Sequence, residues 1–265
     1  SVGTFSNLGI KKVSQTSGNM TVAETTPQGA DSLLRIANDD CDEGQVDLPD
    51  WVSREEPSWG DVLTVDEWRE EQDTAGGQST HSYRQKNGWM GRDLIHDYYS
   101  PVRVLQYYVK YGDDPLPGLS RGGIGTTLTG IVHFTKRAES HRGFCHGGSM
   151  TSVLDDVIGW VGFLVTGQCR PWSGYTVQVN TNLKKPIPVD SILVVKASIV
   201  QIVRRKVSVE ASIFDSKWND NQDEIDQNTI YATAEGLVVI NPGVLPQPFD
   251  RSSTFSSASS SMSDA

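Results

Sequence analysis

The clearest helical periodicity in the chain follows two consecutive glycines near its middle. After Gly148 the apolar residues recur at steps of three and four, at Met150, Val153, Leu154, Val157, Ile158 and Val161. This spacing puts the apolar side chains on one helix face. It therefore predicts a helix over about residues 148–166.

Runs typical of strands lie on both sides of this helix. They are rich in β-branched and aromatic residues and cover residues 102–111, 126–135, 175–183, 190–203, 206–217 and 228–240. Arg204 and Arg205 separate two of these runs and predict a hairpin. One long apolar helix among such strands predicts an α+β domain in which an antiparallel sheet wraps around the helix.

The strand after the helix alternates between two kinds of side chain. Period-two alternation is typical of a half-buried strand. We therefore expect one buried face and one polar face, formed respectively by Tyr175, Val177, Val179 and by Thr176, Gln178, Asn180.

Composition divides the chain into four parts. Residues 1–30 are rich in Ser, Thr, Gly and Gln and are expected to be flexible, as is the Ser-rich tail 242–265. Residues 31–101 form an acidic extension, and residues 102–241 the folded domain. The extension contains Trp51, Trp59 and Trp68, which we expect to pack on the domain, and a short helix is predicted over residues 65–72. The alternative is that this arm docks a partner protein.

Net charge limits the classes of ligand. The chain carries −10 at pH 7, which argues against a general nucleic-acid binder. The acid is concentrated in residues 31–73, with 15 Asp and Glu against 3 Lys and Arg, so the remainder is slightly basic. Cys41, Cys145 and Cys169 follow no metal or disulfide spacing, which fits a reducing, intracellular compartment. No apolar run is long enough to span a bilayer.

The start of the predicted helix offers a place for chemistry. Backbone N–H groups at Gly147 and Gly148 lie where a helix has unpaired donors, which can bind an anion or polarise a carbonyl oxygen. Asp155 and Asp156 follow on opposite sides of the apolar stripe, and periodicity does not choose between them. The simpler interpretation is a glycine turn followed by two solvated acids.

These residues resemble a known family. His146-Gly147-Gly148, the apolar helix and Asp155, followed by the strand GYTVQVNTNLKKPIP at residues 174–188, are similar to the PaaI-like, thioesterase-superfamily branch of hotdog-fold acyl-CoA thioesterases. The resemblance covers about residues 102–241. It implies a hotdog fold, with an antiparallel sheet around one central helix, and a homodimer or dimer of dimers whose active sites lie between subunits.

The resemblance also implies roles for individual residues. It places the catalytic acid at Asp155, as general base or as nucleophile, beside oxyanion donors at Gly147 and Gly148. Thr176 is expected to position the attacking water, and His146 to shape the turn without transferring a proton. The expected cations for the CoA phosphates are Lys184, Lys185, Arg204, Arg205 and Lys206.

The predicted function is hydrolysis of acyl-CoA thioesters to a free carboxylic acid and CoA, in the cytoplasm or the mitochondrial matrix. No cofactor or metal is expected, because the spacing of His133, His141, Cys145 and His146 matches no standard zinc pattern. The alternative is a non-catalytic hotdog domain that binds acyl-CoA or serves as a structural subunit of a larger assembly, since a fold does not determine a function.

Overall fold

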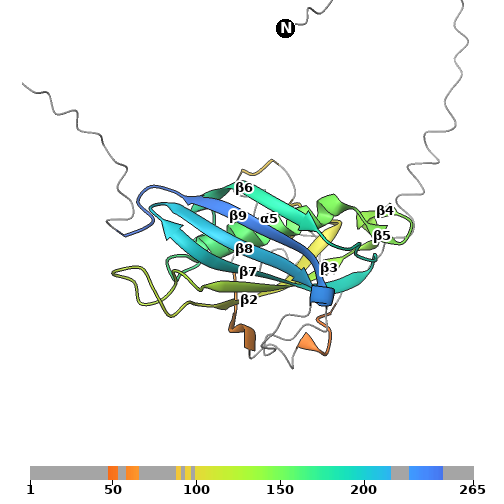
Figure 1. Cartoon of the computed structure of the whole chain (residues 1–265), viewed down its shortest axis with the longest axis horizontal. Coiled ribbons are helices and arrows are strands. Elements are labelled where there is room, and N and C mark those ends of the chain that lie inside the picture. Colours follow the sequence, from red (N-terminus) through yellow and green to blue (C-terminus); the bar gives the residue numbers. More distant parts are fainter. Residues whose placement is uncertain are drawn as a thin grey trace, which may run out of the picture. The chain divides into compact units, whose positions relative to one another are not determined.

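The computed structural model describes residues 47–52, 58–65, 88–90, 93–96, 99–215 and 227–246. The predicted helix over residues 65–72 and Trp68 lie almost entirely outside these ranges, as do Cys41 and both terminal segments. The long helix of the described residues is α5 (Gly147–Phe163), and it begins within one residue of Gly148, as predicted. Figure 1 shows this helix lying against a curved sheet.

The sheet has seven strands, and every neighbouring pair is antiparallel. Their order is β1-β2-β3-β7-β8-β9-β6. The bounds are Asp61–Val62 for β1, Val102–Lys110 for β2, Thr127–Phe134 for β3, Gly174–Leu183 for β6, Ser191–Val203 for β7, Lys206–Phe214 for β8 and Ile230–Ile240 for β9. The predicted hotdog fold of the α+β class is confirmed.

Short elements complete the described fold. A two-stranded ribbon of β4 (Glu139–His141) and β5 (Phe144–Cys145) leads into α5. The 3₁₀ turns η1 (Lys136–Ala138) and η2 (Gln227–Thr229) precede β4 and β9. The predicted hairpin between β7 and β8 is also confirmed, with Arg204 in the left-handed region at φ 55°.

The main core lies between α5 and the concave face of the sheet. Val153, Leu154, Val157, Ile158 and Val161 are fully buried there. The helix lies very close to β9, because a Cβ at Gly236 would stand 2.5 Å from Ile158 Cγ2. Glycine in this strand is therefore what allows the helix and the sheet to approach.

A second cluster covers the opposite face of the sheet. Trp59, from the acidic extension, is 2% exposed and packs with Tyr108 of β2, with ring centroids 5.4 Å apart. Trp51 contacts Trp59 edge to face at 6.4 Å. The prediction that these two tryptophans pack on the domain is confirmed. Residues upstream of Val102 thus contribute to its core.

The predicted faces of β6 are wrong from Tyr175 to Val177 and correct from Gln178 to Asn180. Tyr175 and Val177 are 56% and 48% exposed, whereas Thr176 lies toward α5. The register with β9 shifts between Thr176 and Gln178, so the strand contains an irregularity that returns Val179 to the core side. Such a bulge reverses which residues face inward, and simple alternation cannot anticipate it.

Candidate active site

The first turn of α5 is organised by His146. Its Nδ1 accepts a hydrogen bond from the Gly148 N–H at 2.8 Å, and its carbonyl accepts one from the Ser149 N–H at 3.0 Å. This is the backbone contact that the sequence predicted for His146. Gly147 is the first helical residue, so its N–H has no acceptor within the helix. The Gly147 N–H is therefore the donor that is best placed to receive a ligand oxygen.

Asp155 lies on the flank of α5 that faces β6. The Thr176 side chain lies close enough to it to lower the pKa of its carboxyl group. Gly159, one turn later, faces the same threonine, since a Cβ there would stand 3.5 Å from Thr176 Oγ1. The structure thus brings together two of the predicted catalytic residues. They meet within one chain.

The pKa of Asp155 is raised above its ordinary value of 3.8. Desolvation by the surrounding protein is the main cause, the hydrogen bond with Thr176 opposes it, and the charge of Asp156 adds to it. Asp155 lies two turns into the helix, beyond the first turn in which the helix dipole mainly acts. A raised pKa suits a general base, which works best when its pKa approaches the working pH.

The predicted oxyanion donors and Asp155 are far apart within one chain. Asp155 follows Gly147 by eight residues, which is about 12 Å along the helix axis. Both groups must lie near 3 Å from the reacting atoms to act on the same carbonyl. One chain therefore does not present them to a single thioester.

Asp156 points away from this site. Its Oδ2 accepts a hydrogen bond from the Tyr107 hydroxyl at 2.8 Å and lies 3.1 Å from His96 Nε2. The two acids thus occupy opposite flanks, as the periodicity predicted. Their surroundings differ, because Asp155 lies beside Thr176 and Asp156 lies beside Tyr107 and His96. Sequence reasoning did not single out His96 or Tyr107. They lie 60 and 49 residues from Asp156, and no local pattern links them.

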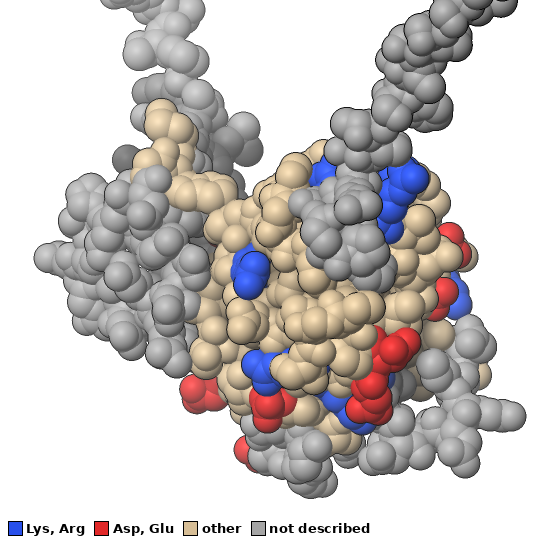
Figure 2. Space-filling model, turned by 90° about the vertical axis from the view of Figure 1, so that its left-hand side faces the viewer, with Lys and Arg blue, Asp and Glu red and all other residues tan. Residues whose placement is uncertain are grey.

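The five predicted CoA-binding cations do not form one cluster within the chain. Lys184 follows Leu183, which pairs with Ala232 at the start of β9, whereas Lys206 pairs with Val239 near its end. Seven strand residues separate these points, or about 23 Å. On the face shown in Figure 2, basic side chains likewise lie in several separate places.

Two of these cations already have partners within the protein. Lys185 Nζ donates a hydrogen bond to the Asn228 carbonyl and lies 4.0 Å from the centre of the Tyr231 ring. Arg205 donates to the Ile240 carbonyl at 2.9 Å. Lys184 and Lys185 are the pair at the same end of the sheet as the start of α5, since a Cβ at Gly147 would contact Leu183.

Over the described ranges, no group of three or more His, Cys, Asp or Glu side chains is arranged to hold a metal ion. Within the same ranges, no helix is both long and apolar enough to cross a membrane.

Comparison with known proteins agrees with this architecture. Residues 142–219 match the family model of the thioesterase superfamily. Acyl-coenzyme A thioesterase THEM4 of Mus musculus is 31% identical over 99 residues, which are 37% of this chain and 36% of that protein. The Bos taurus protein of the same name is 25% identical over 97 residues, or 37% and 34% of the two chains. The aligned segment thus spans about a third of these relatives.

Solved structures are also similar. A hypothetical thioesterase from Streptococcus pneumoniae, solved with coenzyme A, is 16% identical over 51% of this chain and 85% of its own, with a TM-score of 0.37. A Streptococcus mutans protein bound to acetyl-CoA is 17% identical over 56% and 97%, with a TM-score of 0.36. Over its central segment, residues 142–219, the chain is similar to the thioesterase superfamily.

Proposed function

We propose that the protein hydrolyses acyl-CoA thioesters, with Asp155 as the general base. The observation that carries this proposal is the pairing of Asp155 with Thr176 on the open flank of α5, where desolvation raises the pKa of the carboxylate. The curated relatives named acyl-coenzyme A thioesterase support the choice of substrate class.

In the proposed reaction, Asp155 removes a proton from a water molecule as that water attacks the thioester carbonyl. Thr176 orients the carboxylate through their hydrogen bond. The Gly147 N–H stabilises the negative charge that develops on the carbonyl oxygen. Collapse of the tetrahedral intermediate breaks the carbon–sulfur bond. The free acid and CoA leave, and the proton held by Asp155 passes to the thiolate.

A dimer is needed to complete this site. About 12 Å separates Gly147 from Asp155 in one chain, so a single carbonyl requires Gly147 from one subunit and Asp155 of the partner subunit. β6 supports such an assembly, since it is the last strand of the sheet and carries exposed apolar side chains at Tyr175, Val177 and Leu183. An open strand edge of this kind is a template for pairing with a second chain. We therefore propose a homodimer, or a dimer of dimers, built on residues 102–241.

Within that dimer, Lys184 and Lys185 are the proposed contacts for the CoA phosphates. They lie at the end of the sheet where α5 begins. Arg204, Arg205 and Lys206 lie about 23 Å away, too far to contact the same phosphate within one chain. We propose that they contact CoA only if assembly brings them to the partner's site. The substrate class, together with Cys145, which forms no disulfide, supports the predicted intracellular location.

The test is a thiol-release assay with acyl-CoAs of several chain lengths, using the wild type and Asp155→Asn. This substitution keeps the shape of the side chain and removes the base. We expect kcat to fall by about 10²-fold or more, with little change in acyl-CoA binding. A wild type that binds acyl-CoA without releasing thiol would instead establish the non-catalytic alternative.

A single-turnover reaction in ¹⁸O-labelled water distinguishes the two roles that the sequence left open for Asp155. A general base directs the water oxygen into the product acid during the first turnover. A nucleophile forms an anhydride with the acyl group, and attack of water on the Asp155 carbon of that anhydride leaves the label in Asp155 and releases an unlabelled acid. We expect labelled product and an unlabelled Asp155.

A further inference from the structure

A second set of interactions holds α5 from its other flank. Asp156 Oδ2 lies 2.8 Å from the Tyr107 hydroxyl and 3.1 Å from His96 Nε2. The side chains of His96 and Asp156 are 7% and 18% exposed, and Tyr107 is 1% exposed. The three residues come from separate parts of the chain, namely residues 93–96, β2 and α5. A shielded polar network of this kind is directional and is costly to disrupt.

The turn at residues 93–96 is itself organised to present His96. Asp93 Oδ1 accepts hydrogen bonds from the backbone N–H groups of Ile95, at 2.9 Å, and His96, at 3.1 Å. Ser100 Oγ donates to the Asp93 carbonyl at 2.9 Å. Ile95 is 4% exposed and belongs to the main core. This turn therefore docks through both apolar and polar contacts.

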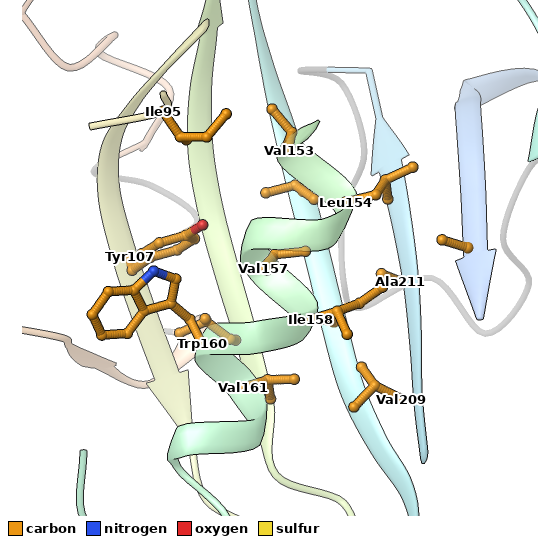
Figure 3. Packing of buried hydrophobic residues seen from close by; sticks show 14 of the residues in the cluster. Ile95, Tyr107, Val153, Leu154, Val157, Ile158, Trp160, Val161, Val209 and Ala211 are labelled. Carbon is orange, nitrogen blue, oxygen red and sulfur yellow. The ribbon is translucent and has the colours of Figure 1, made fainter. Parts of the chain in front are cut away.

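Figure 3 shows the side chains that pack on the two sides of α5. Tyr107, Trp160 and Ile95 lie on one side of α5, while Val209 and Ala211 lie on the other. The His96 ring stands edge-on to both Tyr107 and Trp160, with centroids 6.1 Å apart in each case. Apolar packing alone is non-directional and tolerates small rotations of a helix. Hydrogen bonds to Asp156 from two different elements restrict such a rotation.

Rotation of α5 matters because Asp155 is the neighbouring residue. Its carboxylate lies roughly 6 Å from the helix axis, so a rotation of about 10° moves it by about 1 Å. A displacement of about 1 Å in a catalytic group can reduce the rate by about 10²-fold. The flank that holds Asp156 thus controls where Asp155 points.

We propose that His96 and Tyr107 are positioning residues that act through Asp156 to fix the orientation of Asp155. This inference rests on the proposed function of Asp155. It makes residues 93–96, which lie outside the family-matched segment 142–219, a working part of the active site. The partners of Asp156 also influence Asp155 electrostatically, because the charge of Asp156 contributes to the raised pKa of Asp155.

Charged and titratable groups face the network from three elements. Asp93 faces it from the turn, Asp155 adjoins it on α5, and Tyr107 faces it from β2. The pKa of Tyr107 is raised well above 10.0, first by burial and then by the charge of Asp156. The phenol therefore stays protonated and donates to Asp156 across the working pH range.

The experiment compares His96→Gln and Tyr107→Phe with His133→Gln in the full chain. His133 is a matched control, because its Nε2 lies 3.0 Å from Asp190 Oδ1 and its side chain is 2% exposed, yet it is on β3 and outside the α5 network. We expect kcat to fall by about 10-fold or more in the first two variants, with KM unchanged. The control should unfold at a lower temperature and keep the wild-type kcat.

A second readout does not depend on activity. The titration of the Asp155 carboxyl group, followed by ¹³C NMR and assigned with Asp155→Asn, should move to higher pH in His96→Gln, because the charge of Asp156 loses a compensating donor. It should not move in His133→Gln. If the wild type never releases thiol, the proposed function fails, and this titration still tests the network.

Two results would overturn the inference. One is an Asp155 titration and a kcat that are unchanged in both His96→Gln and Tyr107→Phe. The other is a double variant, His96→Gln with Asp156→Asn, whose losses are the full product of the single losses, since residues that act in one network are not additive. If His96→Gln fails to fold, Tyr107→Phe, which removes one oxygen atom, carries the same test.

Discussion

The two flanks of α5 carry adjacent acids in opposite environments. On one flank Asp155 is exposed at the surface of the chain, next to Thr176 on the open edge strand β6. On the other flank, Asp156 is shielded from solvent. It accepts a hydrogen bond from Tyr107 and lies close to His96. The residue type is the same, and one step along the helix separates the two.

This contrast shows how the surroundings of a carboxylate determine what it can do. A carboxylate with two partners in a shielded site holds other groups in place, and it is a poor candidate for moving protons to a substrate. A carboxylate with one hydroxyl partner and an open side is accessible to water and substrate. The family spacing selects Asp155, and the structure supports that choice with an independent physical reason.

The largest effect on stability is expected from the Asp156 flank. Trp160 is 3% exposed and contacts His96, Phe163 and Trp172, with ring centroids 6.1, 5.4 and 5.8 Å away. Trp160→Ala should lower the free energy of unfolding by about 3–5 kcal/mol, because it removes a large buried ring. Chemical denaturation measures this directly. A loss below about 1 kcal/mol would show that this flank does not hold the helix.

A smaller effect is expected at the start of the helix, which both flanks share. His146→Ala removes the hydrogen bond that caps the Gly148 N–H and should cost about 1 kcal/mol of stability. Because the same turn presents the Gly147 N–H, thiol release should decrease as well. Denaturation and steady-state kinetics on the same sample test whether the loss of stability and the loss of activity occur together. An unchanged rate would argue against an oxyanion role for this turn.

The third effect is a shift in pH dependence on the Asp155 flank. A general base must be ionised, so activity should fall as the pH drops through the raised pKa of Asp155. Thr176→Val removes the hydrogen bond that lowers this pKa, and the acidic limb of the kcat profile should move to higher pH.

In the folding equilibrium the raised pKa favours protonated Asp155, so its stabilising contribution is present at low pH and is lost as the pH rises through that pKa.

The pH–rate profile of Thr176→Val is the measurement, with Thr181→Val, on the exposed part of the same strand, as a control. A profile that moves to lower pH, or equally in both variants, would contradict the assignment of Thr176.

Much of this architecture could be predicted from the sequence. The apolar stripe of α5 and the β-branched runs have strong periodicities, so the helix start, the β7–β8 hairpin and the fold class were correct. The faces of β6 were wrong from Tyr175 to Val177, because a register shift between Thr176 and Gln178 is not visible in a period-two pattern. The contacts of Asp156 could not be found either, since tertiary folding brings His96 to it across 60 residues.

Chemical type alone does not show which of the predicted cations can act together. Lys184, Lys185, Arg204, Arg205 and Lys206 share a charge, yet antiparallel pairing with β9 separates the two groups by about 23 Å. Strand register decides which basic residues can meet, and it depends on pairings that composition does not encode.

The central claim is that Asp155 acts as the general base, whereas Asp156 holds α5 in position. The most direct test measures kcat and the free energy of unfolding for Asp155→Asn and Asp156→Asn, side by side. Asp155→Asn should lose about 10²-fold or more in kcat and change stability by less than about 0.5 kcal/mol, as expected at an exposed position. Asp156→Asn should lose about 1–3 kcal/mol of stability, because it disturbs a shielded network, and keep more activity than Asp155→Asn. An active Asp155→Asn beside a fully stable but inactive Asp156→Asn would contradict the account.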